Sequence, residues 1–297
     1  MNKINKIPSI LIILSVYVIA LEAGYLLSYL MVKDSLLLQL FIMDVIATVI
    51  VYIASVIFKN TSVYDPYWSF VPPILVLIAI IKCKAYNAPV LILFGALVFW
   101  SWRLTINWII TFKGMEKEDW RYAKYRESNN RFVFEIINFF GLQMMPTILV
   151  YAATIPFLVM VEQGTNYLSL IGTAIVLFGA FVELFCDMQL HRFIRTTKEL
   201  KTCQIGLWNY SRHPNYLGEI SIWFGLAIPA IIQYPTLWYI YPGCVLMFLL
   251  FYFISIPLME KRQVKRRSDY TVYQKTTSKL LILPKRKLKD AEEIAAQ

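Results

Sequence analysis

The chain has 297 residues, of which 58% are hydrophobic and only 16% are charged. In soluble proteins, about 45–50% of the residues are hydrophobic and about 25% are charged. A water-soluble globule of this length could not bury so much apolar surface, which excludes a soluble enzyme, a disordered chain and a secreted disulfide scaffold. The net charge is +10, but the basic residues lie in short stretches between apolar runs, as in loops that face an anionic membrane surface rather than in a nucleic-acid-binding face. The composition predicts an integral membrane protein.

Eight apolar segments are candidates for membrane spans, because a bilayer core about 30 Å thick needs roughly 20 apolar residues per helix. The predicted spans are 7–31, 36–58, 68–82, 88–112, 138–161, 166–187, 217–233 and 236–258. The third and seventh are short, so seven spans is the alternative to eight. The expected fold is an all-α, multi-pass helical bundle. We expect N-terminal spans over 1–60, a membrane domain over 61–285 and a polar tail over 286–297.

The basic loops predict the orientation of the bundle. They are 113–131, 191–212 and the tail from Lys261. Two predicted spans separate each of these loops from the next, and four separate the N-terminal Lys3 and Lys6 from the first loop. All of these charges therefore fall on one side, which the positive-inside rule makes cytoplasmic. The sequence predicts that both termini are cytoplasmic and leaves open which membrane holds the protein.

The segment Asn209–Gly225, which reads NYSRHPNYLGEISIWFG, takes a polar cluster directly into an apolar span. Glu219 follows Asn215 by four residues, which places the two on the same face of a helix. A carboxylate at membrane depth normally faces a polar cavity or a partner. The alternative is a cluster that caps the helix and anchors it at the interface, with Glu219 paired to Arg212 or another base.

A second segment, Glu260–Pro284, follows the last predicted span and mixes basic with aromatic residues. Such side chains can hold phosphates and stack on a base. The alternative is a polybasic tail that faces lipid headgroups.

In a third segment, Phe185–Lys201, Asp187 ends the sixth predicted span, and Arg192 and Arg195 follow at helical spacing. A basic helix end that snorkels to the interface is the alternative here. The chain has only two histidines and four widely spaced cysteines. This pattern predicts no metal site, because it lacks metal-ligand spacing.

The three segments, in this order, resemble the steroid 5-alpha-reductase-like family, and most closely its branch of uncharacterised membrane proteins. The segments VYDPYW at 63–68 and GMEKEDWRY at 114–122, and the Trp102-Arg103-Leu104…Asn107 run, add to this resemblance, which covers roughly residues 60–285. The RHPNY element alone is less specific. RHPxYxG before a membrane helix also resembles isoprenylcysteine and phospholipid methyltransferases, which bind S-adenosylmethionine.

The resemblance implies a reductase that binds NADPH at the cytoplasmic side and transfers a hydride to an activated C=C bond. The expected substrate is a lipophilic enone or a steroid- or isoprenoid-like molecule that enters from the bilayer. No G-x-G-x-x-G is present, so the nucleotide site is not of the Rossmann type. The expected cofactor-binding residues are Asp187, Arg192, Arg195, Arg212, His213, Asn215, Tyr216, Glu219, Glu260, Arg262, Tyr270 and Tyr273.

Reductases of this family place an acidic side chain and a tyrosine from the N-terminal spans at the substrate carbonyl. Tyr64 and Asp65 are the nearest candidates, and Glu219 is the third expected catalytic residue. The alternative functions are an S-adenosylmethionine-dependent membrane methyltransferase and a non-catalytic membrane protein. The expected partners are the lipophilic substrate and membrane lipids, with no nucleic acid. The substrate, the preference between NADPH and NADH, and the oligomeric state stay open.

Overall fold

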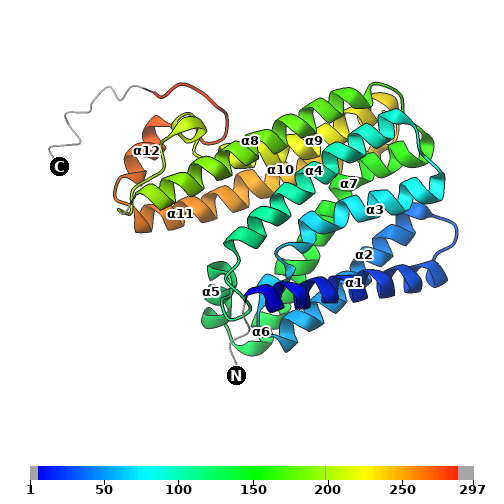
Figure 1. Cartoon of the computed structure of the whole chain (residues 1–297), viewed down its shortest axis with the longest axis horizontal. Helices are drawn as coiled ribbons and strands as arrows, with labels where there is room; N and C mark the ends of the chain where they lie inside the picture. Colours follow the sequence, from blue (N-terminus) through cyan, green and yellow to red (C-terminus); the bar gives the residue numbers. More distant parts are fainter. Residues whose placement is uncertain (1–5, 198, 287–297) are drawn as a thin grey trace. The chain divides into compact units, whose positions relative to one another are not determined.

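The computed structural model describes residues 6–197 and 199–286, and its regular elements are all helices (Figure 1). The long helices are α1 (Lys6–Met31), α2 (Leu36–Ile57), α3 (Tyr67–Cys83), α4 (Ala88–Thr111), α7 (Met145–Gln163), α8 (Ser169–Thr196) and α9 (Pro214–Gln233). The shorter ones are α5 (Trp120–Ser128), α6 (Arg131–Ile136), α10 (Pro242–Leu249), α11 (Ile256–Arg266) and α12 (Tyr270–Thr276). The 3-10 helices η1 (Thr61–Tyr64), η3 (Gly206–Asn209) and η4 (Trp238–Ile240) and the π-helices η2 (Ile137–Met144) and η5 (Leu250–Ser255) complete the set.

Within the described residues, eight helical stretches are long and apolar enough to cross a membrane. They are Lys6–Met31, Leu36–Ile57, Thr61–Cys83, Ala88–Thr111, Arg131–Gln163, Ser169–Thr196, Pro214–Gln233 and Trp238–Arg266. This confirms the predicted multi-pass bundle and its larger count of spans.

Several helices extend beyond the predicted ends. The fifth span begins at Arg131 rather than 138, the sixth runs to Thr196 rather than 187, and the last runs to Arg266 rather than 258. Apolar composition marks only the part of a helix that lies in hydrocarbon, whereas backbone hydrogen bonding continues the helix through polar residues at the interface. The helix that holds Asp187 therefore continues past this residue to Thr196, and the end of the apolar span at Asp187 stays a prediction.

By contacts, the chain divides into two units. Residues to 173, together with 226–243, form unit 1, and residues 174–225, together with those from 244 onward, form unit 2. These units are defined by packing and not by chain order. The predicted domain boundaries after residues 60 and 285 stay predictions. The predicted tail over 286–297 lies, except for Arg286, outside the described residues.

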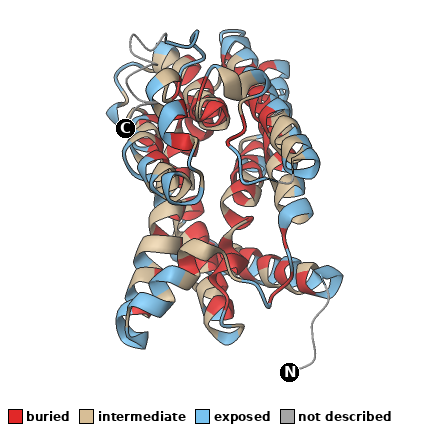
Figure 2. Ribbon diagram, turned by 90° about the vertical axis from the view of Figure 1, so that its left-hand side faces the viewer, coloured by how far each residue is buried: buried red, intermediate tan, exposed pale blue. Residues whose placement is uncertain are grey.

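In unit 1, α1 and α2 run side by side, and α3 packs on both α4 and α7 (Figure 1). The contact of α1 with α2 depends on Gly24, where an added Cβ would lie 2.5 Å from the Met43 carbonyl oxygen. Buried and exposed residues occupy different faces of the long helices (Figure 2). The buried face of this unit includes many hydroxyl groups, among them those of Tyr17, Tyr64 and Tyr67.

In unit 2, α8 and α9 approach each other at two glycines. A Cβ added to Gly179 would lie 2.5 Å from the Gly218 carbonyl oxygen, and one added to Gly218 would lie 2.6 Å from the Gly179 carbonyl oxygen. Small residues allow membrane helices to pack backbone against backbone in this way. The close contact fixes the first half of α9, which carries Asn215 and Glu219.

Candidate functional site

The loop before α9 is held by the C-terminal part of unit 2. The Arg212 backbone N–H donates to the Ser278 carbonyl (2.9 Å), and Ser211 Oγ donates to the Leu280 carbonyl (2.7 Å). Tyr273 on α12 donates its hydroxyl to the carbonyls of Ser211 (3.0 Å) and Trp208. The segments Asn209–Gly225 and Glu260–Pro284, which both carry predicted site residues, are therefore joined by hydrogen bonds.

Glu260 on α11 is the centre of this structure. Its Oε1 lies 3.0 Å from both Arg212 Nε and His213 Nε2, and Gln274 Nε2 donates to its Oε2 at 2.9 Å. Because a carboxylate only accepts, Nε2 is the His213 nitrogen that carries the hydrogen. The Arg212, His213 and Glu260 side chains are only 12%, 8% and 13% exposed. The possible pair of Arg212 with Glu219 was wrong, since Arg212 pairs with Glu260.

Burial sets the ionisation of this cluster. It lowers the pKa of His213 below the usual value, and the hydrogen bond that His213 donates to Glu260 opposes this shift without reversing it. Burial also raises the pKa values of Tyr270 and Tyr273 above the usual range of a phenol. At neutral pH the cluster therefore holds an Arg–Glu ion pair, a neutral imidazole and two phenolic hydroxyls.

The first turn of α9 presents an aromatic stack and an open acceptor. The rings of His213 and Tyr216 are nearly parallel, at 6°, with centroids 5.4 Å apart, and Phe251 packs against Tyr216. Between these two residues in the chain, Asn215 Oδ1 is buried without a hydrogen-bond partner among the described residues. Leaving such an acceptor unpaired costs about 1–3 kcal/mol, which a ligand N–H or O–H group would recover.

The other predicted residues of unit 2 lie on three helices. Glu219 is 3% exposed inside α9, and Trp223 Nε1 donates to its Oε1 at 2.9 Å. Arg192 and Arg195 are exposed on α8 and form no ion pair with a residue that the structure describes. Asp187 on α8 and Arg262 on α11 are half-buried. The structure thus gathers Arg212, His213, Glu260, Tyr270 and Tyr273, and leaves the two α8 arginines on the surface.

In unit 1, Asp65 has a partner that the sequence did not suggest. Tyr122 donates its hydroxyl to Asp65 Oδ1 at 2.6 Å, whereas Tyr64, next to Asp65, bonds Thr147 at 2.7 Å. Burial and the charge of Asp65 raise the pKa of Tyr122 well above its usual value, so this group stays a hydroxyl. The acid and the tyrosine come from the VYDPYW and GMEKEDWRY segments. In the sequence, the only indication that these two segments belong together was that both resemble the same family.

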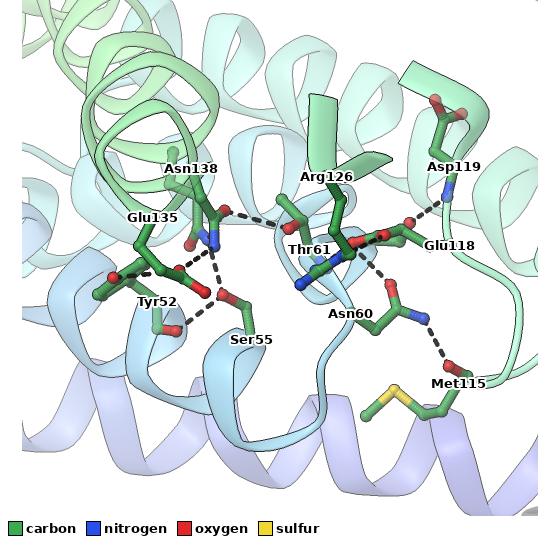
Figure 3. A network of polar contacts seen from close by, with 12 residues as sticks. Tyr52, Ser55, Asn60, Thr61, Met115, Glu118, Asp119, Arg126, Glu135 and Asn138 are labelled. Atoms are coloured by element: carbon green, nitrogen blue, oxygen red, sulfur yellow. Dashed lines mark hydrogen bonds and ion pairs between the residues drawn. The ribbon is translucent and has the colours of Figure 1, made fainter. Parts of the chain in front are cut away.

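A polar network holds the loop that leads into α5, the helix that carries Tyr122 (Figure 3). Glu118 accepts from the Thr61 backbone N–H (2.8 Å) and receives two hydrogen bonds from Arg126 (3.0 and 2.8 Å). Asn60 Nδ2 donates to the Met115 carbonyl at 2.6 Å. Met115 and Glu118 therefore tie the loop to Asn60 and Thr61, at the start of η1. This fixes the position of Tyr122 relative to Asp65.

Comparison with known proteins gives a family but no activity. Residues 51–277 match the family model described as proteins of unknown function, DUF1295, which includes steroid 5-alpha-reductase-like proteins. A protein of Schizosaccharomyces pombe, itself uncharacterised, is 24% identical over 249 residues, covering 73% of this chain and 71% of its own length. No solved structure matches significantly.

Proposed function

The chain belongs to the DUF1295 family, and on this premise we propose that it is a membrane-embedded, NADPH-dependent reductase. The proposed reaction is hydride transfer to the activated C=C bond of a lipophilic enone, such as a steroid- or isoprenoid-like molecule. The buried, unpartnered Oδ1 of Asn215 is the observation that carries this proposal. It lies in the segment that the resemblance assigns to the cofactor.

The residues around Asn215 suit a nicotinamide. The Asn215 oxygen can accept from a carboxamide N–H, and the parallel rings of His213 and Tyr216 provide a flat aromatic surface beside it. Exposed basic residues on α11, such as Lys261 and Lys265, can pair with phosphates. When bound, the nucleotide supplies a hydride. The proposed role of Glu219 is to help orient it, with Trp223 holding the Glu219 carboxylate in place.

In unit 1 we assign the substrate oxygen to Asp65 and Tyr122. Reduction of an enone builds negative charge on the carbonyl oxygen, which a hydroxyl donor can stabilise. With a proton on Asp65, Tyr122 accepts a hydrogen bond from the carboxyl group and turns its own hydrogen toward the substrate. The 2.6 Å contact keeps the two groups in register for this exchange. Tyr64, which the sequence suggested for this role, forms its hydrogen bond with Thr147 instead.

A thermal-shift screen of the purified protein in detergent, with NADPH, NADH and S-adenosylmethionine, tests the proposal. A ligand that binds only the folded state stabilises it by RT ln(1 + [L]/Kd), about 2.7 kcal/mol at a hundredfold excess over Kd. We expect stabilisation by NADPH. Stabilisation by S-adenosylmethionine alone would make the protein a methyltransferase, and no stabilisation by any of the three would contradict a nucleotide-dependent function.

A matched pair of variants locates the site. Asn215→Ala should weaken NADPH binding by about 1–3 kcal/mol, because a buried hydrogen bond to the carboxamide is lost. Asn129→Ala is the control, since Asn129 caps the end of α5 and its Nδ2 donates to the Tyr125 carbonyl of that helix at 2.8 Å. Equal NADPH affinity in both variants would remove Asn215 from the site.

A further inference from the structure

A carboxyl group inside the membrane part of unit 1 has no role in the chemistry so far. Asp44 is 2% exposed, and the helical rise of 1.5 Å per residue places it about 12 Å along α2 from Leu36. This depth lies within a hydrocarbon core about 30 Å thick. Tyr67 donates its hydroxyl to Asp44 Oδ1 at 2.8 Å, and no lysine or arginine among the described residues pairs with the carboxyl group. Ionisable groups at such depth are costly and mark functional sites.

Hydroxyl groups continue from Asp44 through the unit. Thr48 follows Asp44 by four residues, on the same face of α2, and Thr48 Oγ1 lies 2.8 Å from Thr147 Oγ1. Thr147 Oγ1 in turn lies 2.7 Å from the Tyr64 hydroxyl. The five side chains come from α2, η1, α3 and α7, and each is 2% exposed or less. They form one buried file of oxygen atoms with a carboxyl group at one end.

We propose that Asp44, Tyr67, Thr48, Thr147 and Tyr64 form a proton relay that delivers the proton consumed in the reduction. This inference rests on the proposed function. Addition of a hydride to C=C leaves the product one proton short. With a proton on Asp44, the carboxyl group donates to the Tyr67 oxygen in place of the bond that Tyr67 donates now. The O–H bond of Asp44 then breaks, each hydroxyl takes a proton on one side and releases one on the other, and Tyr64, the residue before Asp65 in the chain, releases the last proton. After the product leaves, Asp44 regains its proton from water along the same file of hydroxyls, because its own side chain is buried.

The hydrogen bonding of Thr147 distinguishes a relay from simple helix packing. Thr154 is also buried on α7, but its hydroxyl bonds only the Val150 carbonyl of its own helix (2.8 Å). Thr147 makes the equivalent bond to the Gln143 carbonyl (3.0 Å) and contacts two further hydroxyls besides. A hydroxyl has one donor and two acceptor positions, so Thr147 can receive a proton from one neighbour and pass on its own once that hydrogen turns from the Gln143 carbonyl to the other neighbour.

Infrared spectroscopy tests the relay without any substrate. We expect a carbonyl-stretch band of a protonated carboxyl group that is absent from Asp44→Asn and that shifts as the group exchanges in D2O. Thr147→Val should slow this exchange by at least about tenfold, and Tyr64→Phe should slow it as well. Thr154→Val is the matched control and should exchange like the wild type. Absence of the band, or wild-type exchange in both Thr147→Val and Tyr64→Phe, would overturn the relay.

Single-turnover NADPH oxidation with a lipophilic enone tests the relay in the reaction. General acid catalysis contributes typically 10²–10⁴-fold, so Asp44→Asn should lower the rate by about a hundredfold and enlarge the solvent deuterium isotope effect. Thr154→Val should keep wild-type values. Wild-type rates in Asp44→Asn would refute the relay. If the wild-type protein oxidises no NADPH, the proposed function fails, whereas the infrared exchange reports on the relay independently.

Discussion

At the scale of single residues, His213 and Asn215 belong to one motif but differ in whether their polar atoms have a hydrogen-bond partner within the protein. His213 is satisfied inside the protein by Glu260, while Asn215 keeps a buried acceptor without a partner. The sequence placed both among the cofactor residues because they share the RHPNY element. It could not distinguish them, because the partner of His213 lies 47 residues further along the chain.

His213 should make the stability of the protein depend on pH. Burial lowers its pKa in the folded state below the usual value of about 6.5. As the pH falls through that value, the unfolded chain binds a proton before the folded protein does, so the stability present above pH 6.5 is lost toward lower pH. Thermal unfolding without ligand should show a smaller loss between pH 7 and pH 5 in His213→Gln. Parallel pH profiles of the two proteins would contradict the assignment.

At the scale of elements, Glu260 joins α11 to the loop that precedes α9. Glu260→Gln leaves the Arg212 guanidinium, 12% exposed, without a counter-charge, and breaking a buried pair in this way costs about 3–5 kcal/mol. The double variant with Arg212→Met should lose less than the sum of the single losses, because no charge is then left unpaired. Equilibrium unfolding in mixed micelles measures both values.

The exposed pair of Glu199 and Lys201 is the control for this cycle. Its nitrogen and oxygen lie 2.7 Å apart, but the side chains are 70% and 65% exposed. Surface pairs contribute little because water screens them. Glu199→Gln should leave unfolding unchanged. A loss as large as that of Glu260→Gln would show that the assay does not separate buried from exposed pairs.

The crossing of α8 and α9 provides a second test at this scale. Gly179→Ala puts a Cβ 2.5 Å from the Gly218 carbonyl oxygen, which forces the helices apart, and overpacking of this kind costs typically about 1–3 kcal/mol. At Gly95 on α4 an added Cβ meets nothing within 4 Å. Gly95→Ala should therefore be neutral or stabilise the protein by up to about 1 kcal/mol. Equal stability of the two variants would contradict the close crossing.

The helices were largely predictable, and the contacts between segments were not. Runs of apolar residues identify spans directly, whereas the ends at Arg131, Thr196 and Arg266 depend on capping and interfacial hydrogen bonds. The pair of Asp65 with Tyr122 joins residues 57 apart in the chain. No local pattern encodes such a pairing. Only the shared resemblance of their two segments pointed to it.

For the whole molecule, the division into two contact units goes beyond what chain order could show. Unit 1 takes up residues 226–243 from the C-terminal half of the chain. The first half of α9, with Asn215 and Glu219, belongs to unit 2, while its second half packs in unit 1. Hydropathy reports whether a segment is apolar but carries no information on which neighbours it contacts. A division of this kind was therefore outside the reach of the sequence.

The orientation in the membrane is a further prediction for the whole molecule. Basic residues concentrate in the segments around α5, after α8 and along α11, and the positive-inside rule places these segments on the cytoplasmic side together with both termini. One span, α4, separates the loop at Tyr86 from α5. Tyr86 and Lys124 are both exposed. Replacement of either by cysteine therefore offers a label on each side of the bilayer.

In a background without the four native cysteines, we expect an impermeant maleimide to reach Tyr86→Cys from outside sealed, right-side-out vesicles. Lys124→Cys should react only after the vesicles are permeabilised. The two positions should lie on opposite sides because an odd number of spans separates them. Which position lies outside follows from the positive charge of the loops. Labelling of both positions from the same side would contradict the eight-span arrangement, and labelling with the sides exchanged would reverse the orientation and place the basic loops outside.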